Sequence, residues 1–477
     1  MPVVPPRFRW KTRVLGVGVG VLVIAGSLSY LVWRQSAPGV RVSITPPPRF
    51  IGRATPFTMT LEAARGNIIR ADVRIVQGGA AAVVLKQSTT GARRLEVPLT
   101  VQGAALGLTE GGAMLEVWAT DDYWRPWRRD PRAAASMPVT IDLTPPSIDV
   151  LAATQYLYQG GGGLVVFRVT GGDSAEVRAG ALTYQSFPAG KSGTRLALVA
   201  LPRDFALGTP VTVTASDEAG NTASRGIPAE IRPRRFRSDT IRLSDSFLQI
   251  KVAELLPQHP PSQPLIDGFL LINRDQRLHA EEEKRRVART TADHALWAGP
   301  FLQPRNTKVF SNFAETRAYV YQGKVVDHQV HLGYDLASVK QSPVPAANRG
   351  VVTFTGPLTI YGNTVIIDHG LGLQSLYGHL SSIEVKPGDA VEKGQELGRT
   401  GSTGLAMGDH LHFEVLIGGV SVTPVEWWDA KWIHDHIGRP LEQAGLPELG
   451  GAEARPATNP APTSARPGRS RRADRQR

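Results

Sequence analysis

A run of twenty uncharged residues, from Val14 to Trp33, constrains the fold of this chain more than any other feature. As a helix it would be about 30 Å long, which matches the hydrocarbon core of a bilayer. Basic residues precede it at Arg7, Arg9, Lys11 and Arg13, and such residues favour the cytoplasmic side. The sequence therefore predicts a cytoplasmic basic N-terminus over residues 1–13, a transmembrane anchor over residues 14–33, and a large remainder outside the cytoplasm.

A cleaved signal peptide and a buried core helix both fit this run less well. A signal peptide has a shorter apolar stretch and small residues at its cleavage site, and Ser36-Ala37-Pro38 is a poor site. A buried core helix would show an amphipathic pattern, which this glycine-rich run lacks. We therefore expect an uncleaved, single-pass anchor.

The positive charge of the chain is concentrated at its two ends. A formal net charge of +12 could indicate a nucleic-acid binder. However, residues 1–34 and residues 451–477 each contribute about +5, which leaves about +2 for the long middle. The Pro-, Ala- and Arg-rich tail over residues 448–477 is typical of a disordered segment that contacts anionic lipids or cell-wall polymers only weakly. We expect no nucleic-acid partner.

The chain contains no cysteine. This excludes disulfides, thiolate metal ligands and cysteine nucleophiles, and it fits an oxidising compartment in which no thiol is left to mispair. About 415 residues between the anchor and the tail exceed one ordinary core, so two to four domains are expected.

Residues 40 to 235 have the pattern of β-structure. Runs such as Val40–Ile44, Ala71–Val76 and Val211–Ala215 alternate or are β-branched, and turns rich in Gly, Pro and Asp separate them. A boundary near Leu143–Pro146 predicts two β-sandwich modules, over residues 40–145 and 146–235. The segment Ala215–Asn221 resembles the closing strand and turn of bacterial immunoglobulin-like domains. We expect these modules to serve as spacers, to contact the wall or to bind a cell-wall protein partner.

The residues most suited to chemistry lie in the last third of the chain. His331 and Asp335 stand in His-Leu-Gly-Tyr-Asp, His379 in Leu-Tyr-Gly-His-Leu, and His410 and His412 in His-Leu-His-Phe-Glu. A zinc ion that activates water needs about three protein ligands and one open position, and imidazole and carboxylate groups suit it. A lone pair of this kind is weak evidence for a site. Only the joint pattern indicates a zinc hydrolase.

These residues resemble the motifs of the M23 family of zinc metallopeptidases, also called LytM-type or lysostaphin-type peptidases, which cut peptide bonds in bacterial peptidoglycan. The resemblance covers about residues 300 to 430. Further motifs that carry it are Gly362–Gly370, Val385–Asp389, Gly394–Gly398 and the Gly401-Ser402-Thr403-Gly404 turn.

The resemblance implies a role for each of the five residues. The family's zinc ligands fall on His331, Asp335 and His412, and its two catalytic histidines fall on His379 and His410. Imidazole titrates near neutral pH, so His410 is the candidate general base and His379 would orient water or stabilise charge. The resemblance supports both histidines and leaves the division of their roles open. Residues 405–409 depart from the Ser-Thr-Gly-Pro type sequence of many relatives, which affects the expected substrate preference and not the metal site.

A helical connector is predicted over residues 242–298. Glu281 to Glu283 precede Lys284, Arg285, Arg286 and Arg289, and this charge pattern by itself predicts a solvated helix face. A sharper hypothesis is that the connector, or a sandwich module, covers the active-site groove until a partner moves it.

Structural roles are expected for the remaining histidines and the late tryptophans. His434 and His436 repeat the His-x-His spacing without a partner motif, so we expect structural or solvent-facing roles for them. We expect His369 to support the site by hydrogen bonding, and we assign no role to His328. Trp427, Trp428 and Trp432 are expected to pack the end of the domain.

Together these observations predict a mainly β protein. It has an N-terminal transmembrane helix, two β-sandwich (immunoglobulin-like) modules, a helical connector and an antiparallel β-sheet M23 peptidase domain over residues 300–430. The resemblance implies a zinc-dependent endopeptidase that hydrolyses peptide bonds of peptidoglycan, in a cross-link or a stem peptide. A basic, anchored chain with spacer domains favours a D,D cross-link, an inner-membrane anchor and a periplasmic catalytic domain.

Two functions from different classes compete with this one. A noncatalytic LytM-like activator of a cell-wall amidase would have lost ligands, whereas all five positions are intact here. A periplasmic adaptor would share the motif Val385–Gln395, which also resembles the half-barrel repeat of lipoyl and membrane-fusion adaptors. Such an adaptor would need none of the histidines, and its usual heptad repeats are not visible.

Overall fold

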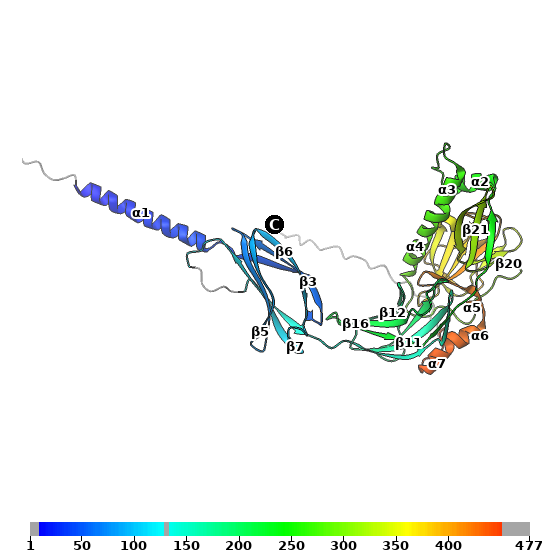
Figure 1. The fold of residues 1–477 in the computed structure, drawn as a ribbon, viewed down its shortest axis with the longest axis horizontal. Helices are drawn as coiled ribbons and strands as arrows, with labels where there is room; N and C mark the ends of the chain where they lie inside the picture. The colour runs from blue at the N-terminus through cyan, green and yellow to red at the C-terminus, as the bar shows by residue number, and fades with distance from the viewer. Residues whose placement is uncertain (1–8, 128–132, 451–477) are drawn as a thin grey trace, which may run out of the picture. The chain divides into compact units, whose positions relative to one another are not determined.

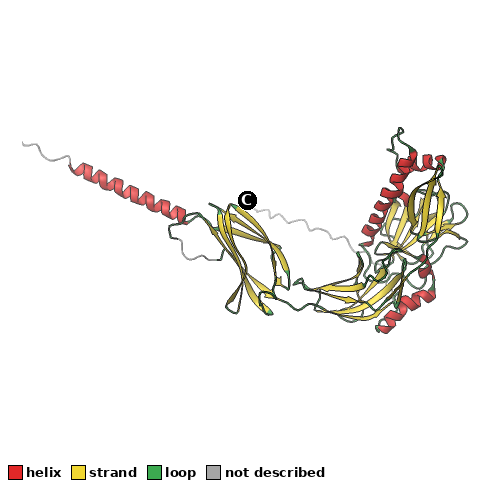
Figure 2. Cartoon of the chain, in the orientation of Figure 1, coloured by secondary structure: helices red, strands yellow, loops and turns green. Residues whose placement is uncertain are grey.

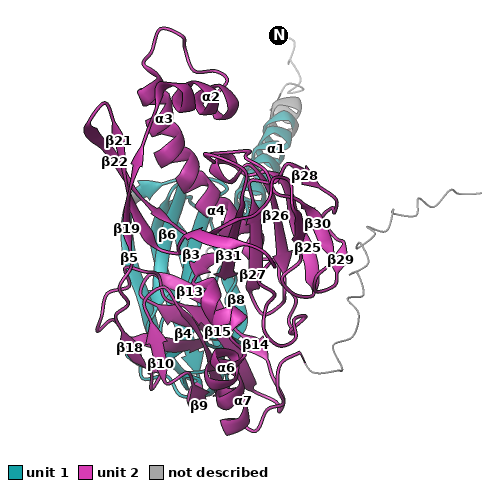
Figure 3. Ribbon diagram, turned by 90° about the vertical axis from the view of Figure 1, so that its right-hand side faces the viewer, with its two compact units in different colours: residues 1–146, 171–174, 216–223 teal, residues 147–170, 175–215, 224–477 magenta. Residues whose placement is uncertain are grey.

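The computed structural model describes residues 9–127 and 133–450 (Figure 1). Part of the predicted basic N-terminus 1–13 and nearly all of the predicted tail 448–477 lie outside the described residues. The chain divides into two compact units, coloured separately in Figure 3. Unit 1 comprises residues 1–146, 171–174 and 216–223, and unit 2 comprises residues 147–170, 175–215 and 224–477. Strands dominate the described residues (Figure 2), which confirms the predicted mainly β class.

The predicted anchor lies within one long helix, α1 (Arg9–Gln35). Its segment Leu15–Gln35 is long and apolar enough to cross a membrane, and none of it is buried against the rest of the protein. A helix can cross a bilayer because it satisfies its backbone hydrogen bonds internally.

A β-sandwich with its own apolar core makes up the rest of unit 1. One sheet has the order β1-β3-β6 and the other the order β2-β8-β7-β4-β5. Side chains from both sheets, among them Met59, Val73 and Leu115, meet in the core. Every second residue of β3 faces inward, as the period of a strand requires. The strands are β1 (Val40–Thr45), β2 (Phe50–Ile51), β3 (Thr55–Ala63), β4 (Ile68–Gln77), β5 (Ala80–Ala92), β6 (Arg94–Val101), β7 (Gly111–Asp121) and β8 (Ala135–Ile141).

A second set of β-sheets opens unit 2, with orders β14-β15-β11-β9 and β13-β12-β16-β17 and a short parallel pair, β10 and β18. This module belongs to the same compact unit as the C-terminal domain. Arg234 and Gly162 both contact Glu426, at 2.6 and 3.0 Å. The strands are β9 (Ser147–Ala153), β10 (Tyr156–Tyr158), β11 (Gly162–Thr170), β12 (Ser174–Ala179), β13 (Leu182–Gln185), β14 (Phe187–Pro188), β15 (Thr194–Ala200), β16 (Val211–Ser216), β17 (Thr222–Gly226) and β18 (Glu230–Arg232).

The connector is helical, but it is also built into the C-terminal domain. Its leading strand β19 (Ser238–Arg242) pairs in parallel with β21, and its helices follow as α2 (Asp245–Leu255), α3 (Leu265–Leu271), η1 (Ile272–Gln276) and α4 (Arg277–Ala288). The solvated face expected around residues 281–289 is wrong at Lys284, whose side chain is 0% exposed. The reason is a buried partner, Glu414, which needs a counter-charge.

An antiparallel sheet of the order β20-β23-β31-β27-β26-β25-β29, with β32 beside β31, forms the C-terminal domain. The predicted hairpin at residues 370–372 joins β26 to β27, and these strands pair as expected. The strands are β20 (Lys308–Ser311), β21 (Glu315–Tyr321), β22 (Lys324–His331), β23 (Tyr334–Ala337), β24 (Pro343–Pro345), β25 (Gly350–Pro357), β26 (Asn363–Asp368), β27 (Leu373–Gly378), β28 (Ser382–Ile383), β29 (Ala390–Val391), β30 (Glu396–Arg399), β31 (Leu411–Ile417) and β32 (Val420–Val422). The helical segments are η2 (Thr359–Tyr361), α5 (Pro424–Trp428), α6 (Ala430–Ile433), η3 (His434–Gly438) and α7 (Arg439–Gln443).

Candidate metal centre

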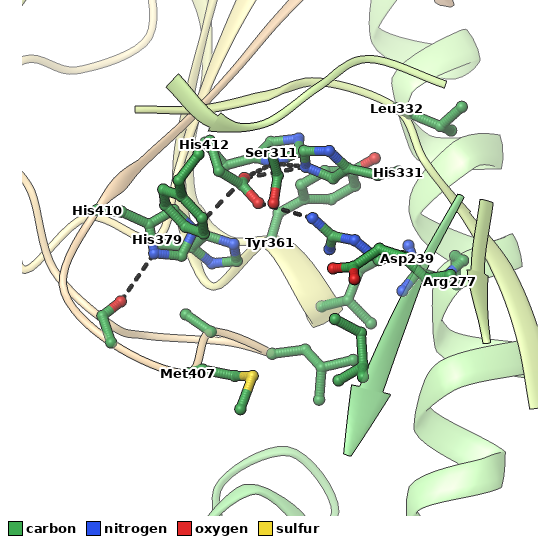
Figure 4. A pocket seen from close by; sticks show the side chains of 18 of the residues that line it. Asp239, Arg277, Ser311, His331, Leu332, Tyr361, His379, Met407, His410 and His412 are labelled. Carbon is green, nitrogen blue, oxygen red and sulfur yellow. Dashed lines mark hydrogen bonds and ion pairs between the residues drawn. The ribbon is translucent and has the colours of Figure 1, made fainter. Parts of the chain in front are cut away.

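The fold brings all five singled-out residues together around one pocket. Figure 4 shows the four histidines among them. His331 ends β22, Asp335 lies in β23 and His412 lies in β31. Asp335 and His412 are direct cross-strand partners, so their side chains project from the same face. His379 follows the last residue of β27, and His410 immediately precedes β31.

Three atoms converge at the centre of this group. His331 Nε2 lies 2.9 Å from Asp335 Oδ1 and 3.1 Å from His412 Nδ1, and His412 Nδ1 lies 2.9 Å from Asp335 Oδ1. Ligand atoms 2.0–2.2 Å from a tetrahedral zinc ion are about 3.3 Å apart, so the observed triangle is close to the size that such an ion requires. Among the described residues, these three form the group that could hold a metal ion.

The outer hydrogen bonds of the two imidazoles determine which nitrogens face inward. His331 Nδ1 donates to the carbonyl oxygen of Asn312, and His412 Nε2 donates to Glu414 Oε1, each at 2.9 Å. The three converging atoms are therefore acceptors that need a cation between them. A proton can supply it: burial alone would lower the pKa of His412, but Asp335 and Glu414 outweigh burial and raise it. A divalent metal supplies the charge more completely and displaces that proton.

Asp335 is held as a carboxylate by its second oxygen. Asp335 Oδ2 accepts a hydrogen bond of 2.9 Å from Arg317, which leaves Oδ1 for the centre. Burial alone would raise the pKa of Asp335, but the surrounding His331, His410 and His412 hold it well below its usual range. A ligand that stays ionised at neutral pH is what metal binding requires.

A buried ion pair supports His412 from behind. Glu414 Oε2 lies 2.8 Å from Lys284 Nζ, and both side chains are 0% exposed. The same ammonium also contacts Glu281 at 2.7 Å, Ser421 at 3.0 Å and the Tyr361 hydroxyl at 3.1 Å. Burial alone would raise the pKa of Glu414, but Lys284 and His412 outweigh burial and hold it low. Helix α4 thus fixes the charge and orientation of the group that orients His412.

The two remaining histidines present one ring nitrogen each to the same space. His379 Nδ1 donates to the carbonyl of Thr403 and His410 Nδ1 to that of Gly408, both at 2.8 Å. Their rings are 4.8 Å apart, and His410 Nε2 lies 3.4 Å from Asp335 Oδ1. His379 adopts a left-handed backbone conformation with φ of 64°, which a non-glycine residue takes only under tertiary constraint.

Gly333 accounts for the spacing between the first two ligands. A Cβ at this position would lie 2.6 Å from both His412 Nε2 and the carbonyl oxygen of Phe413. Both neighbours belong to the site or its backbone, so neither can retreat without moving a ligand. Only glycine allows β22 and β23 to bring His331 and Asp335 this close to β31.

A cleft of about 410 Å³ opens in front of the five residues. Residues Leu405–Asp409, the segment that departs from the family pattern, line it, and Met407 is largely exposed there. Asp239 of β19 and Arg277 of α4 also line it, as Figure 4 shows. Because β19 pairs with β21 and α4 carries Lys284, the connector contributes both to the wall of the cleft and to the support of the metal centre.

The other histidines and the tryptophans lie outside the centre. His369 is fully buried and lies between the Arg349 carbonyl at 2.6 Å and Ser375 Oγ at 2.8 Å, which agrees with a supporting role. His436 stacks on Trp432 at 4.7 Å, and His434 is exposed beside Asp435. Trp427 is buried, as expected of a residue that packs the end of the domain.

Sequence reasoning missed the residues that support the centre: Lys284, Asn312, Arg317, Tyr361, Thr403 and Glu414. Of these, Glu414 had a detectable signal, because it follows His410 and His412 at the two-residue period of a strand. Thr403 belongs to the Gly401–Gly404 turn that carries the family resemblance, whereas the other four come from distant segments without a local signal.

Comparison with known proteins matches this region to a family. Residues 329–424 match the profile of peptidase family M23. The chain is 43% identical over 97 residues to the DD-carboxypeptidase/endopeptidase Mpg of Neisseria meningitidis serogroup B, which is 20% of this chain and 22% of that protein. It is 36% identical over 119 residues to the peptidoglycan DD-endopeptidase ShyA of Vibrio cholerae, which is 25% of this chain and 27% of that protein.

A solved catalytic domain of the prophage-encoded M23 protein EnpA from Enterococcus faecalis is 30% identical, with a TM-score of 0.23, and the match covers 26% of this chain and 95% of that one. The chain spans only 22 to 27% of the length of the two curated relatives named above. Each of these matches therefore covers only about a quarter of this chain or less.

Proposed function

We propose that the chain is a zinc-dependent endopeptidase of the bacterial cell wall, because residues 329–424 match peptidase family M23. It would act on peptidoglycan outside the cytoplasm. Its anchor would be α1, a single pass through the inner membrane, with the catalytic domain in the periplasm. The support for this placement is the apolar segment Leu15–Gln35 together with the basic residues that precede it.

One observation carries the proposal: three buried acceptor atoms, from His331, Asp335 and His412, converge within 3.1 Å at the mouth of a cleft. Two nitrogens and one carboxylate oxygen form a donor set that suits zinc and leaves a coordination position open. Zinc held there would acidify a water molecule and polarise a carbonyl group.

The chain's own residues would carry the proton transfers. We assign to His410 the role of accepting a proton from the attacking water and returning it to the leaving amine. Its Nδ1 proton is fixed on the Gly408 carbonyl, so Nε2, which lies 3.4 Å from Asp335 Oδ1, is the nitrogen that would exchange protons in the site. His379, fixed in the same way on Thr403, would orient the water or stabilise the developing negative charge.

The bond that we propose is a D,D cross-link of peptidoglycan. The names of the curated relatives, a DD-carboxypeptidase/endopeptidase and a DD-endopeptidase, support this choice over a polyglycine bridge. The sandwich modules contribute no group to the described cleft, so we assign them to spacing or to binding a cell-wall partner.

The test is muropeptide analysis of purified cross-linked peptidoglycan after incubation with the zinc-loaded full chain in detergent. His412→Ala is compared with His436→Ala, a matched control in the second His-x-His pair of the same domain. We expect cross-link cleavage by the parent and the control, and none by His412→Ala. The masses of the products identify the bond.

Absence of cleavage by the parent, when zinc is bound and the protein is folded, would refute the enzyme assignment. Stimulation of a separate amidase by that inactive protein would then identify it as an activator. Cleavage by His412→Ala at the parental rate would refute the assigned metal site while leaving a hydrolase in place.

A further inference from the structure

The outer end of α1 is joined to a loop of the unit 1 sandwich. Arg34 Nε donates to the carbonyl of Trp124 at 3.2 Å. Gln35 exchanges two hydrogen bonds with the backbone of Trp127, at 3.0 and 3.4 Å. Arg125 reaches the backbone carbonyls of Ala37 and Pro38, at 3.4 and 3.0 Å. The loop over residues 122–127 therefore lies level with the end of the apolar helix.

This junction carries aromatic rings that are about half exposed. Trp124 is 56% exposed and Trp127 is 50% exposed, and Tyr30 and Trp33 of the last helical turns are exposed to similar extents. Large apolar side chains gathered on one small surface are uncommon in a water-facing protein. Indole and phenol rings, with one apolar and one polar part, are enriched where a membrane meets water.

Cationic groups accompany these rings. The guanidinium of Arg34 lies 4.3 Å from the Tyr123 ring centre and 5.2 Å from that of Trp124, and Arg65 lies 4.5 Å from that of Trp33. Arginines interleaved with aromatic rings match the interfacial zone, where rings enter the headgroup layer and guanidinium groups meet lipid phosphates.

From these contacts we propose that residues 122–127 dock into the headgroup region of the bilayer that α1 spans, with the last turn of α1 and Arg65 completing the docking surface. The continuity of the loop with the end of the span selects the lipid interface as its occupant. A span of about 20 residues fills the hydrocarbon core, so residues near its end, and whatever is bonded to them, lie at the level of the headgroups.

Attachment through both α1 and the loop over residues 122–127 would hold the unit 1 sandwich against the membrane surface. Attachment through α1 alone would leave the sandwich free to rotate about the end of the helix. The competing occupant is a cell-wall glycan, because sugars also stack on indole rings. If the loop binds glycan and not lipid, it will stay exposed to water in a bilayer that lacks peptidoglycan. The test therefore measures whether the loop is exposed to water or to lipid in such a bilayer.

The absence of cysteine allows single sites to be spin-labelled without a background. The full chain is placed in nanodiscs of phosphatidylethanolamine and phosphatidylglycerol, with a label at Trp124→Cys, at Trp127→Cys, or at the control Val83→Cys, which is 51% exposed on β5 of the same sandwich. Collision rates with oxygen and with a water-soluble nickel chelate are measured. We expect severalfold less nickel collision and more oxygen collision at positions 124 and 127 than at position 83.

A second measurement keeps both sites free of labels. Brominated lipids should quench less total tryptophan fluorescence in a Trp124→Phe/Trp127→Phe variant than in the parent. Nickel access at positions 124 and 127 equal to that at position 83, or equal quenching in the parent and the double variant, would overturn the proposal. Protection that appears only after peptidoglycan fragments are added would overturn it in favour of the glycan. None of these outcomes depends on peptidase activity.

Discussion

Replacing Lys284 by methionine should damage the site from a position outside it. Methionine fills similar volume but carries no charge, so Lys284→Met removes the ammonium counter-charge of Glu414, a carboxylate with 0% exposure that keeps its hydrogen bonds to His412 and Ser421. Breaking a buried pair from one side costs about 3–5 kcal/mol, because the remaining charge keeps its desolvation penalty. We expect a loss of stability of unit 2 in that range.

The same change should weaken metal binding. Glu414 holds His412 through a hydrogen bond of 2.9 Å, and a carboxylate that becomes protonated can no longer accept it in the same way. Loss of such supporting groups typically costs about 10–100-fold in metal affinity. Zinc affinity is measured by competition with a chromophoric chelator, and stability by hydrogen exchange of β31 and α4, since a chain of two units need not unfold in one step.

Arg286→Met is the matched control two residues along the same helix. Arg286 pairs with Glu283 at the surface, and its side chain is 65% exposed. Exposed pairs of this kind contribute little to stability, because water and salt screen them. If Lys284→Met loses no more stability and no more zinc affinity than Arg286→Met, the reasoning about the buried pair is refuted. Partial recovery in the double variant Lys284→Met/Glu414→Gln is expected, because the stranded charge is then removed.

Three further predictions concern packing, pH and metal. Gly333→Ala should lower zinc affinity, whereas Gly226→Ala, where nothing lies within 4 Å, should not; equal affinities would contradict the packing argument. Burial lowers the pKa of His369 from 6.5 to about 4, so the unfolded chain binds more protons between these values. Its contribution to stability is complete above pH 6.5 and is lost as pH falls towards 4, by about 3 kcal/mol. Denaturation at several pH values should show that the free energy of unfolding falls less steeply with falling pH in His369→Gln than in the parent. The same pH dependence in both proteins would show that His369 does not cause it. Removing zinc from a sample that holds it at about 1,000 times its Kd should cost unit 2 about 4 kcal/mol, and His412→Ala should abolish the effect of chelation on thermal unfolding.

The sequence was most informative where a local pattern determines the structure. The uncharged run to Trp33 became one helix, and the period-2 pattern placed Val211–Ala215 in β16. The five candidate residues were predicted because their types and order resemble a known motif, and the turn at residues 370–372 joins the hairpin that His379 follows.

The rest of the site depends on contacts between distant segments. Lys284 precedes Glu414 by 130 residues. The charges around Lys284 are typical of a solvated helix face, and only the structure shows that its partner Glu414 is buried. Arg317 gave no local signal, because its hydrogen bond to Asp335 exists only once β21, β22 and β23 are assembled. The integration of the second sandwich with the C-terminal domain was equally invisible, since Glu426 meets Arg234 across 192 residues.

Zinc-edge X-ray absorption on the zinc-loaded full chain would show whether His331, Asp335 and His412 hold the metal. We expect one zinc ion per chain with a first shell of two imidazole nitrogens and one or two oxygens at about 2.0–2.2 Å, and loss of that shell in His412→Ala but not in His436→Ala. A shell that survives in His412→Ala, or a zinc ion surrounded by water alone, would contradict that assignment.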